Sequence, residues 1–226
     1  MIQKLQIGDT TINIEYKEGD DSVKELFKYI KMAFKKAEEF FGYKLNSELN
    51  FLIIYSREEM DKHWGSKTKD WITAFTNKQG DRITMFSPSK VEEYTKHPKE
   101  RIYKIIQHEI FHLFINSKGF LPWWLNEGLA SYLADQKRYD CIGPLKNLYK
   151  SNKMFTYKRE NFIYCMSNGG YRASYFIINK ILDDFGKGKI IKLLKLKPTN
   201  ENINSLFEKV FEISPQNYIS RLISNA

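Results

Sequence analysis

The segment His108-Glu109-Ile110-Phe111-His112 lies inside a stretch, residues 98–119, with the apolar spacing of a helix. Apolar residues recur there at intervals of three and four, namely Ile102, Ile105, Ile106, Leu113 and Phe114. Side chains four residues apart share one face of a helix, about 5–6 Å apart at Cβ. His108 and His112 can therefore bind one metal ion together. Glu109 lies one position round the helix, where it can reach a metal-bound water without becoming a ligand itself.

Zinc suits this pair of histidines because it accepts imidazole and carboxylate ligands and can keep one position open for water. A catalytic zinc of this type needs a third protein ligand. The segment 122–130 places an acid, Glu127, on a second predicted helix after a short connection. That helix would bring Glu127 to the metal if it folds back against the first. The alternatives are an ordinary amphipathic helix and a solvent-exposed Glu127, but two of the four histidines fall within the motif.

The N-terminal part of the chain is predicted to mix strands with helices. Apolar residues alternate on both sides of Gly8-Asp9, which predicts a hairpin. A helix should start at Ser22, with Glu25 completing a capping box, and end at Gly42. The next expected elements are a strand at 51–55, a helix opened by a capping box of Ser56 and Glu59 and ended near Gly65, and strands at 71–75 and 83–86.

From Pro98 onward the apolar pattern is helical only. After the motif helix, helices are expected from Pro122 through Leu133, and at 170–185, 188–196, 203–212 and 215–224. Mixed strands and helices followed by helices alone indicate an α+β fold with a helical second lobe. A length of 226 residues suits one sizeable domain, with a β/α lobe at 1–120 and a helical lobe at 121–226.

The composition excludes several classes of protein. Hydrophobic residues make up 42% and charged residues 28%, as in an ordinary globular protein. Two cysteines are too few for a disulfide-dense scaffold or a four-thiolate zinc site. No apolar run approaches the roughly 20 residues of a transmembrane segment, and the N-terminus lacks a signal peptide. We expect a cytoplasmic protein if the chain is complete, or a secreted one if a leader was removed.

The net charge of +9 raises the possibility of a nucleic-acid partner. The basic residues of the chain are mostly lysine and are spread along its whole length. In nucleic-acid-binding surfaces, by contrast, arginine residues are usually clustered or basic residues alternate with aromatic ones. We therefore expect no nucleic-acid partner.

The sequence HEIFH (108–112) followed by WLNEGLASYL (124–133) resembles the gluzincin metallopeptidases. It is most similar to the zinc aminopeptidase branch and to the small peptidase-MA-like proteins related to it. The resemblance implies a thermolysin-like zincin fold with the metal helix at the cleft floor. It also implies that His108, His112 and Glu127 bind zinc and that Glu109 is the general base.

A tyrosine at the head of a later helix donates a hydrogen bond to the tetrahedral intermediate in that family. Tyr171, fifteen residues before Gly186, matches this position, and Tyr175 one turn on is the alternative. A purely structural role is the other interpretation of Tyr171. Three departures separate the chain from the aminopeptidases: a shorter gap between His112 and Glu127, no GAMEN-type segment, and Arg172 where the family has a glutamate. Aminopeptidase specificity is therefore not implied.

The sequence predicts a zinc-dependent peptide-bond hydrolase acting on a peptide or protein substrate. Glu109 would activate a zinc-bound water, and Tyr171 and the metal would stabilise the oxyanion. The strand at 83–86 is expected to be the sheet edge along which an extended peptide pairs. The alternatives are an inactive gluzincin-fold module that binds peptide or regulates, and a basic nucleic-acid-binding protein with an accidental motif. Endopeptidase and exopeptidase activity are both compatible with these residues.

Overall fold

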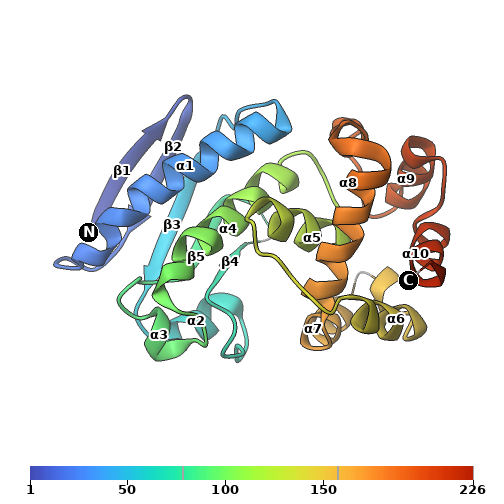
Figure 1. Cartoon of the computed structure of the whole chain (residues 1–226). Helices are drawn as coiled ribbons and strands as arrows, with labels where there is room; N and C mark the ends of the chain where they lie inside the picture. Colours follow the sequence, from blue (N-terminus) through green and yellow to red (C-terminus); the bar gives the residue numbers. More distant parts are fainter. Residues whose placement is uncertain (78, 157, 226) are drawn as a thin grey trace. The chain divides into compact units, whose positions relative to one another are not determined.

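The computed structural model describes residues 1–77, 79–156 and 158–225, and the chain forms two compact units, Met1–Ser117 and Lys118–Ala226. Strands and helices alternate in the first unit, whereas the described residues of the second form helices only (Figure 1). The protein is therefore mixed α/β, compatible with the predicted α+β class.

The first unit is built on one sheet of five strands. Its elements are β1 (Ile2–Ile7), β2 (Thr10–Glu15), the 3-10 helix η1 (Asp21–Val23), α1 (Lys24–Phe41), β3 (Glu48–Ile54), α2 (Arg57–Trp64), β4 (Ala74–Thr76), β5 (Arg82–Phe86), α3 (Val91–Tyr94), η2 (Lys99–Arg101) and α4 (Ile102–Asn116). The predicted hairpin is confirmed, since β1 and β2 pair antiparallel. After β2 the chain returns to the starting end through α1, and after β3 it returns through the antiparallel strand β4, so β2, β3 and β5 run parallel.

The expectation that the strand at 83–86 forms a sheet edge is wrong. The strand order is β1-β2-β3-β5-β4, so β5 pairs with β3 on one side and with β4 on the other. The edge strand on this side of the sheet is β4, which covers only the end of the strand predicted at 71–75. Hydrophobic alternation identifies both strands of such a pair, but it contains no information on which of them lies outside.

Helices α1 and α4 lie across the same face of the sheet (Figure 1). Aromatic side chains join them: the ring of Phe114 is 5.6 Å from that of Phe34 and stacks on Phe41 at 5.8 Å between centroids. Every residue of α4 from Ile106 to Ile115 is buried. A helix enclosed on all sides cannot shift without disturbing the core, so α4 is a rigid support for the side chains that it carries.

One of the two predicted capping boxes is confirmed in part, because the Glu59 carboxylate accepts from the backbone N–H of Tyr55 and not from that of Ser56. The Ser56 hydroxyl accepts a hydrogen bond from the backbone N–H of Glu59, as predicted. The box of Ser22 and Glu25 is wrong, because Asp20 caps a 3-10 turn before α1 by accepting from the N–H of Ser22. A carboxylate two residues earlier is a stronger acceptor than the serine hydroxyl.

The second unit consists of helices in its described residues: α5 (Trp123–Leu133), α6 (Ile142–Lys150), η3 (Lys153–Phe155), α7 (Arg159–Ser167), α8 (Gly170–Lys195), α9 (Ile203–Phe211) and α10 (Pro215–Ser224). The predicted break at Gly186 is confirmed, since its φ of 71° interrupts α8. The sequence did not predict α6 and α7. None of the helices in the described residues is long and apolar enough to cross a lipid bilayer.

Candidate metal centre

Helix α4 presents the predicted motif residues in a nearly dry environment. His108, Glu109 and His112 are only 6%, 7% and 8% exposed. Burial of polar side chains is costly unless they are hydrogen-bonded or bind a ligand. These three polar groups, buried close together on one apolar helix, are therefore candidates for a functional site.

The two imidazoles converge on one point. The Nε2 atoms of His108 and His112 lie 3.0 Å apart, so that one protonated ring can donate a hydrogen bond to the other. The rings are nearly perpendicular, at 85°, with centroids 4.6 Å apart. The i, i+4 spacing thus brings both ring nitrogens to the same position, as the sequence predicted.

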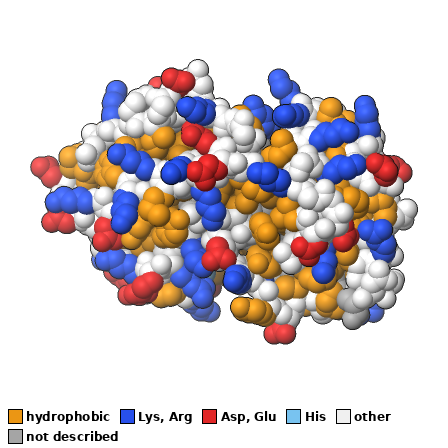
Figure 2. Space-filling view, turned by 45° about the horizontal axis from the view of Figure 1, so that its top comes forward, with side chains coloured by type: hydrophobic (Ala, Val, Ile, Leu, Met, Phe, Trp, Pro, Cys, Tyr) orange, Lys and Arg blue, Asp and Glu red, His pale blue; other side chains and the backbone are white. Residues whose placement is uncertain are grey.

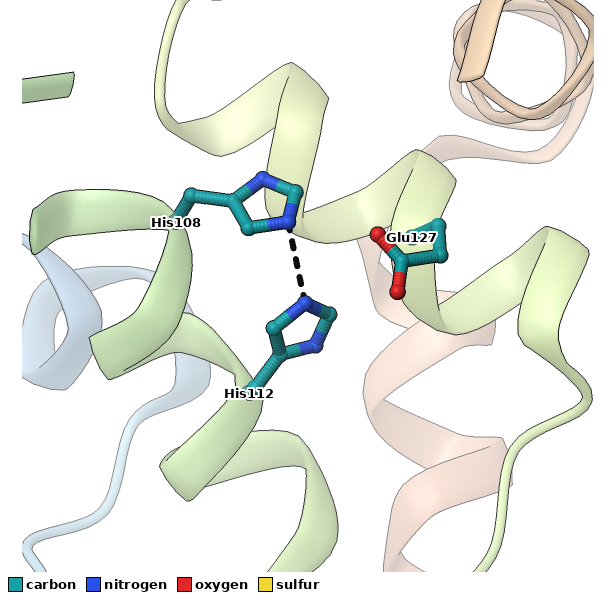
Figure 3. A group of neighbouring side chains, drawn as sticks. All are labelled: His108, His112 and Glu127. Atoms are coloured by element: carbon teal, nitrogen blue, oxygen red, sulfur yellow. Dashed lines mark hydrogen bonds between the residues drawn. The ribbon is translucent and has the colours of Figure 1, made fainter. Parts of the chain in front are cut away.

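Glu127 on α5 joins this pair. One ligand atom from each of His108, His112 and Glu127 lies within 4.8 Å of the other two. Figure 3 shows the carboxylate of Glu127 turned toward the two imidazoles. Within the described residues this is the one group of three or more His, Cys, Asp or Glu side chains arranged closely enough to hold a metal ion.

The donor set fits a divalent metal ion. Two zinc–nitrogen bonds of about 2.0–2.1 Å at a tetrahedral angle would hold the nitrogens about 3.4 Å apart. The observed separation of 3.0 Å therefore needs to widen by only a few tenths of an ångström. Two neutral imidazoles and one carboxylate are also the ligand types that catalytic zinc sites use.

Glu109 is not a member of this group, and its carboxylate has a partner of its own. The hydroxyl of Thr76, the last residue of β4, donates a hydrogen bond of 2.8 Å to Oε2 of Glu109. The same hydroxyl lies 3.2 Å from the backbone carbonyl oxygen of Glu109. The carboxylate is thus kept beside the ligands on the same helix, separate from them, as the proposed role of a base requires.

The two candidate oxyanion donors lie in the first turns of α8. Tyr171 is the second residue of this helix, and the guanidinium of Arg138 lies 5.6 Å from the centre of its ring. The ring of Tyr175 is 6.1 Å from that of Tyr132. Burial raises the pKa of Tyr175, so its hydroxyl keeps the proton that a donor needs. The predicted position of Tyr171 at the head of the helix is confirmed, and its role stays a prediction.

Gly128, directly after Glu127, allows α5 to pack closely on α8. A Cβ atom at this position would collide with the backbone carbonyl oxygen of Ser174 and lie 2.7 Å from Cγ1 of Ile178. No sequence pattern indicated this contact, because a close approach between helices leaves no local pattern. The glycine therefore determines where the helix carrying Glu127 can sit against its neighbour.

Substitution of Gly128 by alanine should lower the free energy of unfolding by about 1–3 kcal/mol, the usual cost of overpacking. The matched control is Gly143→Ala in α6, where a Cβ atom would meet nothing within 4 Å. The control should be neutral or stabilise by up to about 1 kcal/mol. Urea denaturation of the metal-free proteins measures both changes. Equal stabilities would contradict the tight contact between α5 and α8.

No family model matches the chain, and no curated protein is significantly similar to it. The interpretation of the site therefore depends on the residues and geometry described above. The sequence predicted the three members of the His/His/Glu group, but it missed Thr76, which lies 33 residues before Glu109 in a different element.

Proposed function

We propose that this protein is a metal-dependent peptide-bond hydrolase of the gluzincin type, with zinc held by His108, His112 and Glu127. One observation carries the proposal. A buried carboxylate, Glu109, lies next to a convergent His/His/Glu group without belonging to it and is held by a hydrogen bond to Thr76. A site that only binds metal has no need of this additional buried acid.

Each residue has a distinct part in the proposed reaction. Bound zinc would polarise a substrate carbonyl and lower the pKa of water towards about 7. Glu109 accepts the proton of the attacking water at its carboxylate and later delivers it to the leaving amine. Tyr171, or Tyr175 in its place, donates a hydrogen bond to the oxygen on which negative charge develops.

The edge of the sheet offers a place for an extended peptide. Strand β4 is short and lies at the end of the strand order, and its residue Thr76 contacts Glu109. A peptide added to this edge by backbone hydrogen bonds would run close to the base. We assign the peptide-binding edge to β4 in place of the strand at 83–86.

A thermolysin-like zincin fold is part of the proposal. It is supported by the order of the elements: a sheet, then a buried helix with the HExxH residues, then a helix with the third ligand. The alternative function of a nucleic-acid-binding protein gains no support from Figure 2. On the face shown there, Lys and Arg side chains are interrupted by acidic and hydrophobic ones.

The test is the metal content of the purified protein after dialysis against metal-free buffer, followed by a peptide-library cleavage screen. We expect about one zinc per chain and cleavage that stops when the metal is chelated. Two histidines and a carboxylate also bind iron in oxygenases, so elemental analysis must distinguish the two metals. Zinc without cleavage of any peptide would favour the inactive peptide-binding module. No metal, and none taken up from added zinc, would contradict the metal centre.

A further inference from the structure

We propose that Thr76 is a positioning residue that fixes the Glu109 carboxylate relative to a peptide lying on the edge of the sheet. This inference rests on the proposed hydrolase function and concerns a residue outside the HExxH and NEG segments.

The hydroxyl of Thr76 restrains the carboxylate directly. It donates to Oε2 of Glu109 at 2.8 Å and also lies 3.2 Å from the backbone carbonyl oxygen of the same residue. Glu109 is 7% exposed, so water cannot readily replace this donor. The carboxylate therefore depends on Thr76 for its orientation.

The backbone of Thr76 faces the open side of the sheet. The residues that flank β4 are hydrogen-bonded to the strand opposite. The backbone N–H of Asn77 donates to the carbonyl oxygen of Arg82 at 2.9 Å, and the N–H of Phe86 donates to the carbonyl oxygen of Thr73 at 3.1 Å. Hydrogen-bonded and non-hydrogen-bonded pairs alternate along an antiparallel ladder. Thr76, opposite Ile83, therefore falls in a non-hydrogen-bonded pair, and its N–H and C=O point away from β5.

Thr76 thus contributes to two parts of the proposed site, the peptide-binding edge and the base. Its backbone offers a donor and an acceptor to an extended peptide, while its side chain holds the base. The χ1 angle of threonine is restricted by its branched Cβ, which limits the positions that the hydroxyl can take. Thr76 would in this way keep the distance between the peptide backbone and the Glu109 carboxylate constant.

The experiment compares three substitutions that preserve the strand. Thr76→Val removes the hydroxyl and keeps the shape of the side chain, and Thr76→Ser retains the hydroxyl. The matched control is Thr73→Val, because Thr73 is 4% exposed and its hydroxyl has no hydrogen-bond partner among the described residues. Each protein is assayed with a peptide that the parent cleaves, and its zinc content is measured.

Thr76→Val should lower kcat by about 10- to 100-fold, as expected when a reacting group is displaced by about 1 Å. Its KM should stay within about twofold of the parent value, because the backbone of β4 is unchanged. Thr76→Ser should restore most of the activity, and Thr73→Val should behave as the parent. Zinc content should be the same in all four proteins.

A second readout needs neither metal nor activity. The side-chain carboxyl of Glu109 gives a ¹³C resonance in metal-free protein labelled at glutamate Cδ, and its loss in Glu109→Gln assigns it. At one fixed pH, Thr76→Val should shift or broaden this resonance, and Thr76→Ser should not.

The two readouts separate the failure of this inference from that of the proposed function. A Thr76→Val protein with parental kcat and an unmoved resonance would overturn the role of Thr76. A parent protein that cleaves no peptide would overturn the hydrolase function, while the resonance would still show whether Thr76 holds Glu109.

Discussion

Replacement of Glu109 by glutamine should lower kcat by about 10²–10⁴-fold and leave the metal content unchanged. Glutamine has the size of glutamate but cannot accept a proton at neutral pH, so the attacking water loses its base. The His/His/Glu group does not include Glu109, so the ligands remain intact. Loss of turnover with retention of metal is the pattern that distinguishes a base from a ligand.

The fold should tolerate this change. The amide oxygen of glutamine can accept the hydrogen bond that Thr76 now donates to Oε2 of Glu109. A neutral side chain is also less costly to bury than a carboxylate. We therefore expect the thermal midpoint of the metal-free variant to equal or exceed that of the parent, which excludes unfolding as the cause of lost activity.

The measurement combines peptide cleavage, elemental analysis and circular dichroism. Glu100→Gln serves as the control, because Glu100 is an exposed residue just before α4. It should retain parental activity. Turnover by Glu109→Gln at the parental rate would show that the assigned base is wrong, and loss of its zinc would place Glu109 among the ligands.

The convergence of His108, His112 and Glu127 could be predicted because its determinants are local. The i, i+4 spacing of His108 and His112 fixes their convergence once the helix forms. Glu127 follows after a connection short enough to restrict where its helix can go. In both cases the spacing of a few residues along the sequence predicts how the side chains lie in the structure.

Features that depend on contacts between segments distant in the sequence were not predicted. Thr76 reaches Glu109 from an edge strand, and nothing in the sequence around either residue indicates the contact. The same holds for the strand order, in which the strand predicted as the edge is internal. Both depend on how the sheet is assembled, and hydrophobic alternation does not specify this.

Helices α6 and α7 were missed for a different reason. Gly143 and Pro144 are residue types that disfavour a helix interior, but they lie in the first turn of α6, where proline is tolerated because the N–H groups there have no partner within the helix. In α7 the buried residues are Cys165 and Met166 only, too few to form an apolar stripe. Short helices with small buried faces leave a weak periodic pattern.

Replacement of Glu127 by alanine should weaken zinc binding by at least about 100-fold, more than the loss of an outer-shell partner usually costs. The variant keeps two of three ligands, and two imidazoles alone hold a divalent ion poorly in a buried site. Stabilisation by saturating zinc would fall by about 2.7 kcal/mol for a 100-fold weaker affinity. The zinc-induced rise in thermal midpoint should therefore shrink markedly.

Competitive titration with a chelating dye gives the affinity, and thermal denaturation with and without zinc gives the stabilisation. Glu160→Ala is the matched control, since Glu160 is exposed in the first turn of α7 and should leave both values unchanged. A parental affinity in Glu127→Ala would exclude Glu127 as the third ligand.

The sharpest comparison is the same chemical change at two positions. Glu127→Gln removes a ligand charge, whereas Glu109→Gln removes a base, and each preserves the size of the side chain. Zinc affinity should be weakened or lost in Glu127→Gln and retained in Glu109→Gln. Neither protein should hydrolyse peptide efficiently. Identical zinc affinities in the two variants would contradict the assignment, because a ligand and a base would then be indistinguishable.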